Sequence, residues 1–147
     1  MRLKLPRFGE IVAGAAGALL LLSLFLPWYS GGVDACIQIV DPPRPCAPTQ
    51  LSAWDSLAVL DILFAIVALA GIALLALEAT QRTSAVPVAW ATLTALTASI
   101  AAPIALYRTL DPPGALDPRF AFLGLIACAG VAAGAWLSMR DEGIDRR

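Results

Sequence analysis

The chain of 147 residues is 59% apolar with a mean hydropathy of +0.78, which leaves too little polar surface for a soluble globule of this size. Its formal charge of -1 argues against the basic surface that nucleic-acid binding needs. Histidine is absent and the three cysteines are widely spaced, so we expect no metal centre, no catalytic triad and no cofactor.

Four apolar segments dominate the chain, at 8–27, 54–80, 86–107 and 120–139. Each supplies about the 20 helical residues that cross a hydrocarbon core roughly 30 Å thick. We therefore expect residues 1–147 to form one membrane domain, an all-α polytopic transmembrane four-helix bundle. The basic start is also typical of a signal peptide, but the end of the first segment lacks a small-x-small cleavage site, and we expect an uncleaved helix.

Lysine and arginine are biased toward one side of this arrangement. With both termini cytoplasmic, only Arg44, Arg108 and Arg119 of the 10 basic residues lie outside. Positive charge near a segment end resists translocation, so we expect cytoplasmic N and C termini in a bacterial plasma membrane. The external loops are then 28–53 and 108–119, and the cytoplasmic link is 81–85.

The first external loop is rich in proline, which lacks an amide donor and disfavours helix in the preceding residue. We expect an irregular, partly extended and cysteine-containing loop. An oxidising exterior favours a disulfide between Cys36 and Cys46 in this loop. A structural bond is one interpretation and a redox-active pair is the other. Cys128 falls within the fourth segment and is expected to pack there.

The second segment begins with a predicted capping box, in which Ser52 is the N-cap and Asp55 the acidic partner. Asp61 follows six positions later, about 9 Å deeper at helical rise, where a carboxylate needs a partner or a proton. We expect an ion pair between Asp61 and Arg108, acting as a structural clasp; the alternative is a proton or cation site. Substitute partners at the same outer end are Tyr107, Arg119 and, as a second acceptor, Asp55.

Aromatic residues gather at the expected outer boundary, namely Trp28, Tyr29 and Trp54. Amphipathic aromatic rings are enriched at membrane interfaces, so we expect these three to anchor the chain in lipid. An aromatic-lined external pocket is the alternative. Glu10 and Glu78 fall near the inner boundary and are expected to be solvated.

Small residues recur at helix-packing spacing, as in Gly9, Ala13 and Gly17 of the first segment and Gly130 and Gly134 of the fourth. In lipid, close backbone approach over small side chains supplies much of the association between helices. We expect Gly130 and Gly134 to pack within the chain. A dimerisation face is the alternative interpretation.

Several motifs together carry a resemblance to a known group: Leu-Pro-Trp-Tyr at 26–29, Ser-Ala-Trp-Asp at 52–55 with Asp61, the turn at 107–114 and the helix end at 134–142. They resemble small four-helix membrane proteins of high-GC actinobacteria, over nearly the whole chain. The resemblance implies this fold and a bacterial membrane, and it implies no activity.

We expect a non-enzymatic integral membrane protein whose outer side binds or supports another component of the cell envelope. Its expected partners are the lipid bilayer and an envelope protein or a second copy of the chain, with no nucleic acid. One alternative is a small proton-coupled transporter or oligomeric pore centred on Asp61. The other is a membrane thiol oxidoreductase that uses Cys36 and Cys46.

Overall fold

The computed structural model describes residues 7–31, 50–57, 59–80, 85–112, 116–118 and 120–144. Its helices are α1 (Phe8–Ser23), α2 (Ala53–Ser56), α3 (Val59–Thr80), α4 (Ala85–Leu110) and α5 (Ala121–Ile144). Its strands are β1 (Pro27–Gly31), β2 (Gln50–Ser52) and β3 (Leu116–Pro118). The predicted helical fold is confirmed, with a small sheet that the sequence did not predict.

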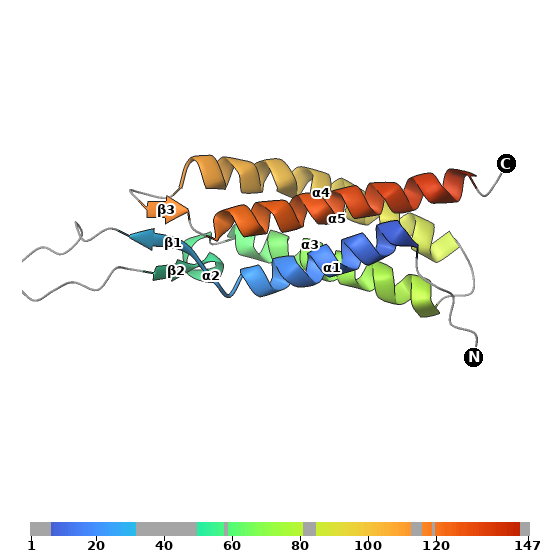
Figure 1. The fold of residues 1–147 in the computed structure, drawn as a ribbon, viewed down its shortest axis with the longest axis horizontal. Coiled ribbons are helices and arrows are strands. Elements are labelled where there is room, and N and C mark those ends of the chain that lie inside the picture. Colours follow the sequence, from blue (N-terminus) through green and yellow to red (C-terminus); the bar gives the residue numbers. More distant parts are fainter. Residues whose placement is uncertain are drawn as a thin grey trace, which may run out of the picture.

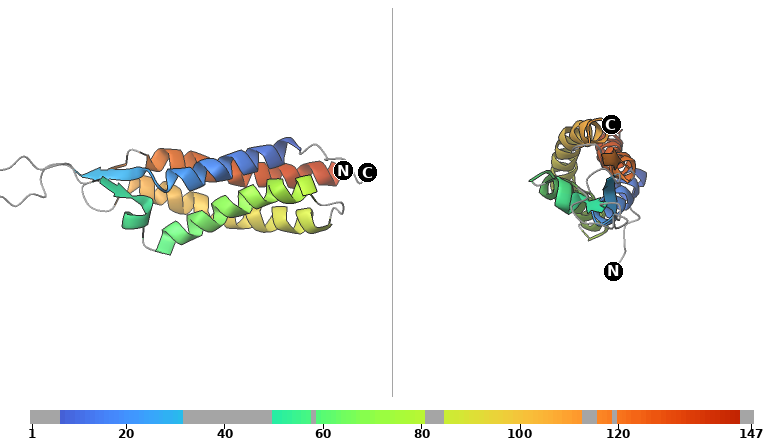
Figure 2. Two further views of the ribbon diagram at one scale, coloured as in Figure 1. Left: turned by 90° about the horizontal axis from the view of Figure 1, so that it is seen from below. Right: turned by 90° about the vertical axis from the view of Figure 1, so that its left-hand side faces the viewer.

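The four long helices run side by side along one axis (Figures 1 and 2). Helix α5 packs against α1 and α4, and α3 packs against the same two helices. All three strands and α2 lie at one end, which we call the sheet end. Helix α1 begins and α5 ends at the opposite end, the far end.

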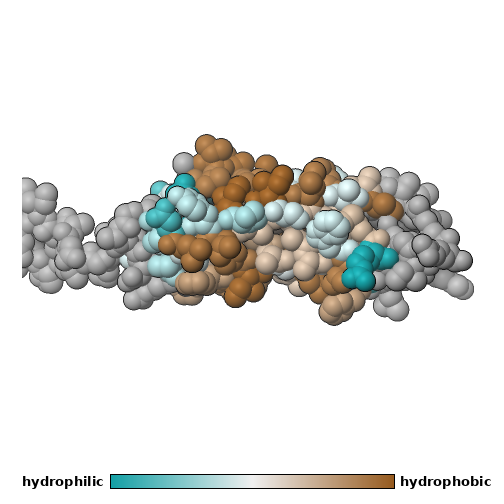
Figure 3. Space-filling model, turned by 90° about the horizontal axis from the view of Figure 1, so that it is seen from above, coloured by the Kyte–Doolittle hydropathy of each residue, from teal (hydrophilic) through white to brown (hydrophobic). Residues whose placement is uncertain are grey.

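Three of the long helices, α3, α4 and α5, are long and apolar enough to cross a membrane. Helix α1 is also apolar but has only 16 residues, about 24 Å of helical rise. Brown, hydrophobic residues cover much of the length in Figure 3, divided by a paler band, while the teal residues lie toward the two ends. This surface distribution suits helices whose outer faces contact lipid.

Helix α1 ends at Ser23, four residues before the predicted boundary at 27. The amides of Phe25 and Leu26 donate to the carbonyls of Leu22 and Ser23, a tighter pattern than that of an α-helix. Pro27 then disfavours helical geometry in the residue before it. The chain therefore turns directly from α1 into β1.

The second segment is broken, so the prediction of one helix over 54–80 is wrong. Its capping box is confirmed, since the Asp55 carboxylate accepts hydrogen bonds from the Ser52 amide (3.3 Å) and hydroxyl (2.6 Å). Helix α2 lasts one turn and stops at Leu57, whose side chain is buried in the core. Burial of Leu57 under the sheet end explains why the chain bends there before α3 begins at Val59.

The helices approach one another closely over glycines. A Cβ atom at Gly134 of α5 would lie 2.5 Å from the Ala13 amide nitrogen and 2.7 Å from the Gly9 carbonyl oxygen. A Cβ at Gly71 of α3 would lie 2.7 Å from the Ala13 carbonyl oxygen. At Gly130 the nearest atom would be a methyl group of α1. The prediction that Gly130 and Gly134 pack within the chain is confirmed.

The sheet has the order β2-β1-β3, and both pairs of strands are antiparallel. In β1, Ser30 is paired with Gln50 on one side and with Asp117 on the other. The loop was expected to be irregular and partly extended; Pro27–Gly31 and Gln50–Ser52 are extended and are also paired as strands, which the sequence did not predict. The first predicted external loop contributes β1 and β2 and the second contributes β3, so one sheet joins the two loops.

Candidate functional site

The central strand β1 contains an irregularity that directs two large aromatic side chains into the protein. Pro27 pairs with Ser52 and Tyr29 pairs with Leu51, so Trp28 is an extra residue without its own cross-strand partner. Side chains normally alternate between the faces of a strand, and a bulge of this kind changes that alternation. Consistent with this, the adjacent Trp28 and Tyr29 are both fully buried.

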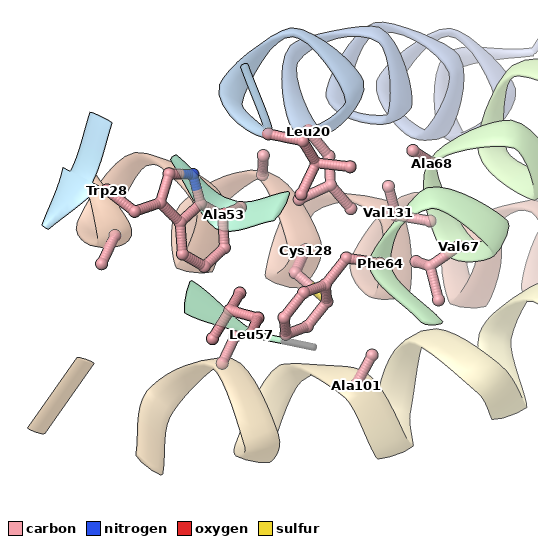
Figure 4. Packing of buried hydrophobic residues seen from close by; sticks show 14 of the residues in the cluster. Leu20, Trp28, Ala53, Leu57, Phe64, Val67, Ala68, Ala101, Cys128 and Val131 are labelled. Carbon is pink, nitrogen blue, oxygen red and sulfur yellow. The ribbon is translucent and has the colours of Figure 1, made fainter. Parts of the chain in front are cut away.

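Trp28 fixes the sheet end to α1, α3 and α5. Its indole nitrogen donates a 2.7 Å hydrogen bond to the Ser23 carbonyl at the end of α1. Its ring lies 5.7 Å from the ring of Phe64 on α3. The indole also fills the space beside Gly124 on α5, where a Cβ would lie 2.6 Å from ring atom Cη2. Figure 4 shows Trp28 entering the same buried cluster as Leu57 and Phe64.

Tyr29 fixes the sheet end to α4. Its hydroxyl donates a 3.1 Å hydrogen bond to the Arg108 carbonyl in the last turn of that helix. Burial raises the pKa of the Tyr29 phenol above its usual value, and the positive charge of Arg108 opposes this shift. The fold thus favours the neutral phenol, the form that can donate this hydrogen bond.

Of the three aromatic residues expected to anchor the chain in lipid, two are buried and one is exposed. Trp28 and Tyr29 are buried, so the prediction that they anchor the chain in lipid is wrong. Trp54 on α2 is 39% exposed. Its ring lies 6.0 Å from that of Phe25, which is also exposed. The aromatic cluster at this end is thus divided into an inner pair and an outer pair.

Asp61 lies in the first turn of α3 and is 6% exposed. Its Oδ1 accepts a 2.6 Å hydrogen bond from the Ile62 amide. Because the break at Leu57 separates Asp61 from Asp55, the predicted depth of 9 Å along one continuous helix does not apply. A carboxylate in the first turn of a helix is instead stabilised by the helix dipole and by amides without helical partners.

The expected partners of Asp61 have other contacts in the described part of the chain. The Tyr107 hydroxyl donates a 2.7 Å hydrogen bond to Asp111, and Asp55 serves the cap of α2. Arg108 is half-buried. Its ion pair with Asp61 stays a prediction. Arg119 lies outside the described residues.

Of the three cysteines, the structure describes only Cys128. Cys36 and Cys46 lie outside the described residues, so their disulfide stays a prediction. Cys128 is buried in the core with Phe64 and Leu20, as Figure 4 shows, and is a packing residue. Among the described residues, no group of histidine, cysteine, aspartate or glutamate side chains could hold a metal ion.

At the far end, two carboxylates are buried that the sequence analysis expected to be solvated. Glu10 on α1 is 1% exposed and Glu78 on α3 is 4% exposed. One oxygen of Glu10 accepts a 2.7 Å hydrogen bond from the Arg7 amide in the capping box of α1. Helical spacing was the missed signal: Glu10 precedes Ala13 and Gly17 by three and seven positions, on the face that packs inward.

The interior between the two ends is apolar. Phe64 and Val67 of α3 pack with Leu20 of α1 and Val131 of α5, and all four side chains are fully buried (Figure 4). The Thr94 hydroxyl on α4 is buried and has no hydrogen-bond partner within the described part of the chain. The packed apolar cluster thus separates Asp61 at the sheet end from the buried glutamates at the far end.

The chain was compared with protein-family models, curated proteins and solved structures, and it matches none of them. The resemblance to actinobacterial four-helix membrane proteins therefore stays a hypothesis.

Proposed function

We propose that the chain is an integral membrane protein whose four long helices cross a bacterial plasma membrane, with both termini in the cytoplasm. Three helices of spanning length support the membrane assignment. The bias of lysine and arginine toward the termini and the 81–85 link supports the orientation. In this orientation the sheet end faces the cell exterior.

The proposed role is a non-enzymatic one: the sheet end is an interaction surface for another protein of the envelope. The observation that carries this proposal is the attachment of the sheet to the helices through Trp28 and Tyr29. Their hydrogen bonds, to the carbonyls of Ser23 and Arg108, hold β1 against α1 and α4. A surface held in one geometry loses less conformational entropy when a partner binds, which favours recognition.

Crosslinking in living cells tests this role. We would place a photo-activated amino acid at Gln50, an exposed residue of β2, and a matched control at Leu96, an exposed apolar residue of α4. The expected result is a discrete envelope-protein adduct from position 50 that is absent from position 96 and is lost when Trp28→Ala releases the sheet. Identical adducts at both positions, or none at position 50, would contradict the proposal.

A proton-coupled transporter or an oligomeric pore is the second candidate. The buried carboxylates Asp61, Glu10 and Glu78 favour it, since ionisable groups inside a membrane commonly mark transport pathways. The apolar cluster around Phe64 argues against a path through one copy of the chain. Purified protein in vesicles loaded with a pH-sensitive dye should show no proton flux above protein-free vesicles. A flux that Asp61→Asn abolishes would replace the interaction proposal with transport.

The thiol oxidoreductase is the third candidate, and it rests on the predicted pair of Cys36 and Cys46. Redox activity requires a disulfide that mild reductants open, whereas a structural disulfide resists them. No described residue bears on this alternative. Reduction of the purified protein by a graded series of thiol reagents separates the two roles of the cysteine pair.

A further inference from the structure

Exposed aromatic side chains lie next to the sheet in four parts of the chain. They are Phe25, Trp54, Tyr107 and Phe120. We call these four residues the collar. Trp54 and Tyr107 carry a polar group on an apolar ring, a combination that suits the boundary between hydrocarbon and water.

Contacts with the sheet place the collar residues at a common level. Phe25 and Trp54 contact each other beside the paired ends of β1 and β2. Tyr107 precedes Arg108, whose carbonyl is bonded to the Tyr29 hydroxyl. Phe120 lies two positions after Pro118, the partner of Tyr29 in β3. Each collar residue is therefore close along the chain to a residue held by the sheet.

The exposed charges give an independent measure of the membrane-facing length. Among the residues whose side chains the structure describes, the exposed charged ones are Asp55 and Asp111, near the collar, and Arg140, near the far end. Arg140 lies 20 positions after Phe120, which is about 30 Å at helical rise. This length equals the thickness of a typical hydrocarbon core.

We infer that the collar binds the phospholipid headgroup boundary of the outer leaflet and sets the depth of the chain, so that the sheet stands in water outside the bilayer. This inference rests on the proposed membrane insertion and orientation. It replaces the buried Trp28 and Tyr29 with residues that can reach lipid. It also places Trp136, an exposed residue of α5 bonded to Ser99, four positions before Arg140 and so about 6 Å from the inner boundary of the hydrocarbon core.

Depth-dependent fluorescence quenching tests the inference in the full chain. The protein would be reconstituted into phosphatidylcholine vesicles with bromine atoms either near the top or near the end of the acyl chains. Emission from the wild type would be compared with that from Trp54→Phe and from Trp136→Phe, a matched pair because both rings are exposed. Each substitution removes the emission of one known side chain.

The expected result is that Trp54→Phe and Trp136→Phe each remove a component quenched mainly by the shallow bromines, because Trp54 lies near the outer boundary of the hydrocarbon core and Trp136 near the inner one. The collar would be overturned if the Trp54 component were quenched better by the deep bromines, or only by aqueous iodide, while Trp136 still responded to lipid. If neither component responded to any brominated lipid, the proposed membrane insertion would fail together with the collar.

Discussion

The contact between Trp28 and Gly124 predicts that Gly124→Ala destabilises the wild-type protein but stabilises the Trp28→Phe variant. In the wild type, Gly124→Ala places a methyl group 2.6 Å from Cη2 of the indole and also against Cζ2. Relief to an ordinary carbon contact of about 3.5 Å requires a shift of roughly 1 Å. Overpacking of this kind costs roughly 1–3 kcal/mol, which the better helix propensity of alanine offsets by about 1 kcal/mol.

Trp28→Phe removes both ring atoms that oppose the methyl group. Alone, this variant should be destabilised, because it loses the hydrogen bond to the Ser23 carbonyl, about 1 kcal/mol, and leaves unfilled volume beside α5. In this background Gly124→Ala fills part of that volume and still gains helix propensity. The double variant should therefore be more stable than Trp28→Phe alone, with a coupling energy of roughly 1–3 kcal/mol between the two sites.

The free energy of unfolding would be measured by titrating sodium dodecyl sulfate into mixed micelles and following helicity by circular dichroism, since Trp28→Phe alters fluorescence. Gly130→Ala is the control, because its methyl group would meet Ala16 on α1 and not Trp28. Its effect should be equal in both backgrounds. If the effects of Gly124→Ala and Trp28→Phe were additive within about 0.5 kcal/mol, the proposed packing of the indole on α5 would be refuted.

Three further predictions concern other parts of the chain. Tyr29→Phe should cost about 1 kcal/mol of stability through the lost hydrogen bond. Burial raises the pKa of Tyr29, so the stability that the neutral phenol contributes is complete below the unfolded pKa of 10.0 and is lost as pH rises through the folded pKa. The melting temperature of the wild type should therefore fall more steeply with rising alkaline pH than that of the variant. Gly134→Leu should lower the melting temperature strongly and leave the mass measured by light scattering unchanged. Ala133→Leu, on the exposed face, should change neither the melting temperature nor the mass. A loss of dimer mass in the Gly134 variant would point to an interface between copies. Reduction should slow the protein on denaturing gels if Cys36 and Cys46 form the predicted disulfide, and an unchanged mobility with both thiols open to alkylation would reject it.

Local chemistry was sufficient to predict the helices and their close packing. The apolar segments identified all four long helices, and Ser52 with Asp55 identified the start of α2. The spacing of Gly130 and Gly134 identified a contact between helices. Each of these signals acts within a few residues of chain, which is why the sequence alone carries it.

The sheet end was harder to predict because it depends on contacts between distant segments. Strand β3 has three residues, Leu116–Pro118, and pairs with a strand far from it in sequence. Strand preference depends strongly on the neighbours that a strand finds. The burial of Trp28 follows from a bulge in the register of that sheet, so composition alone made Trp28 look like a residue at the lipid boundary. The break at Leu57 has the same origin in packing.

The order of the strands has a consequence for biosynthesis. The central strand β1 follows the first helix, but its partner β3 follows α4 and therefore emerges only after three of the long helices have been made. Contacts between segments so far apart close late, since the intervening chain must first be ordered. The sheet can therefore be completed only after α4 has inserted. In a chain whose α4 failed to insert, β1 would keep an unpaired edge, which would expose the chain to quality-control proteolysis.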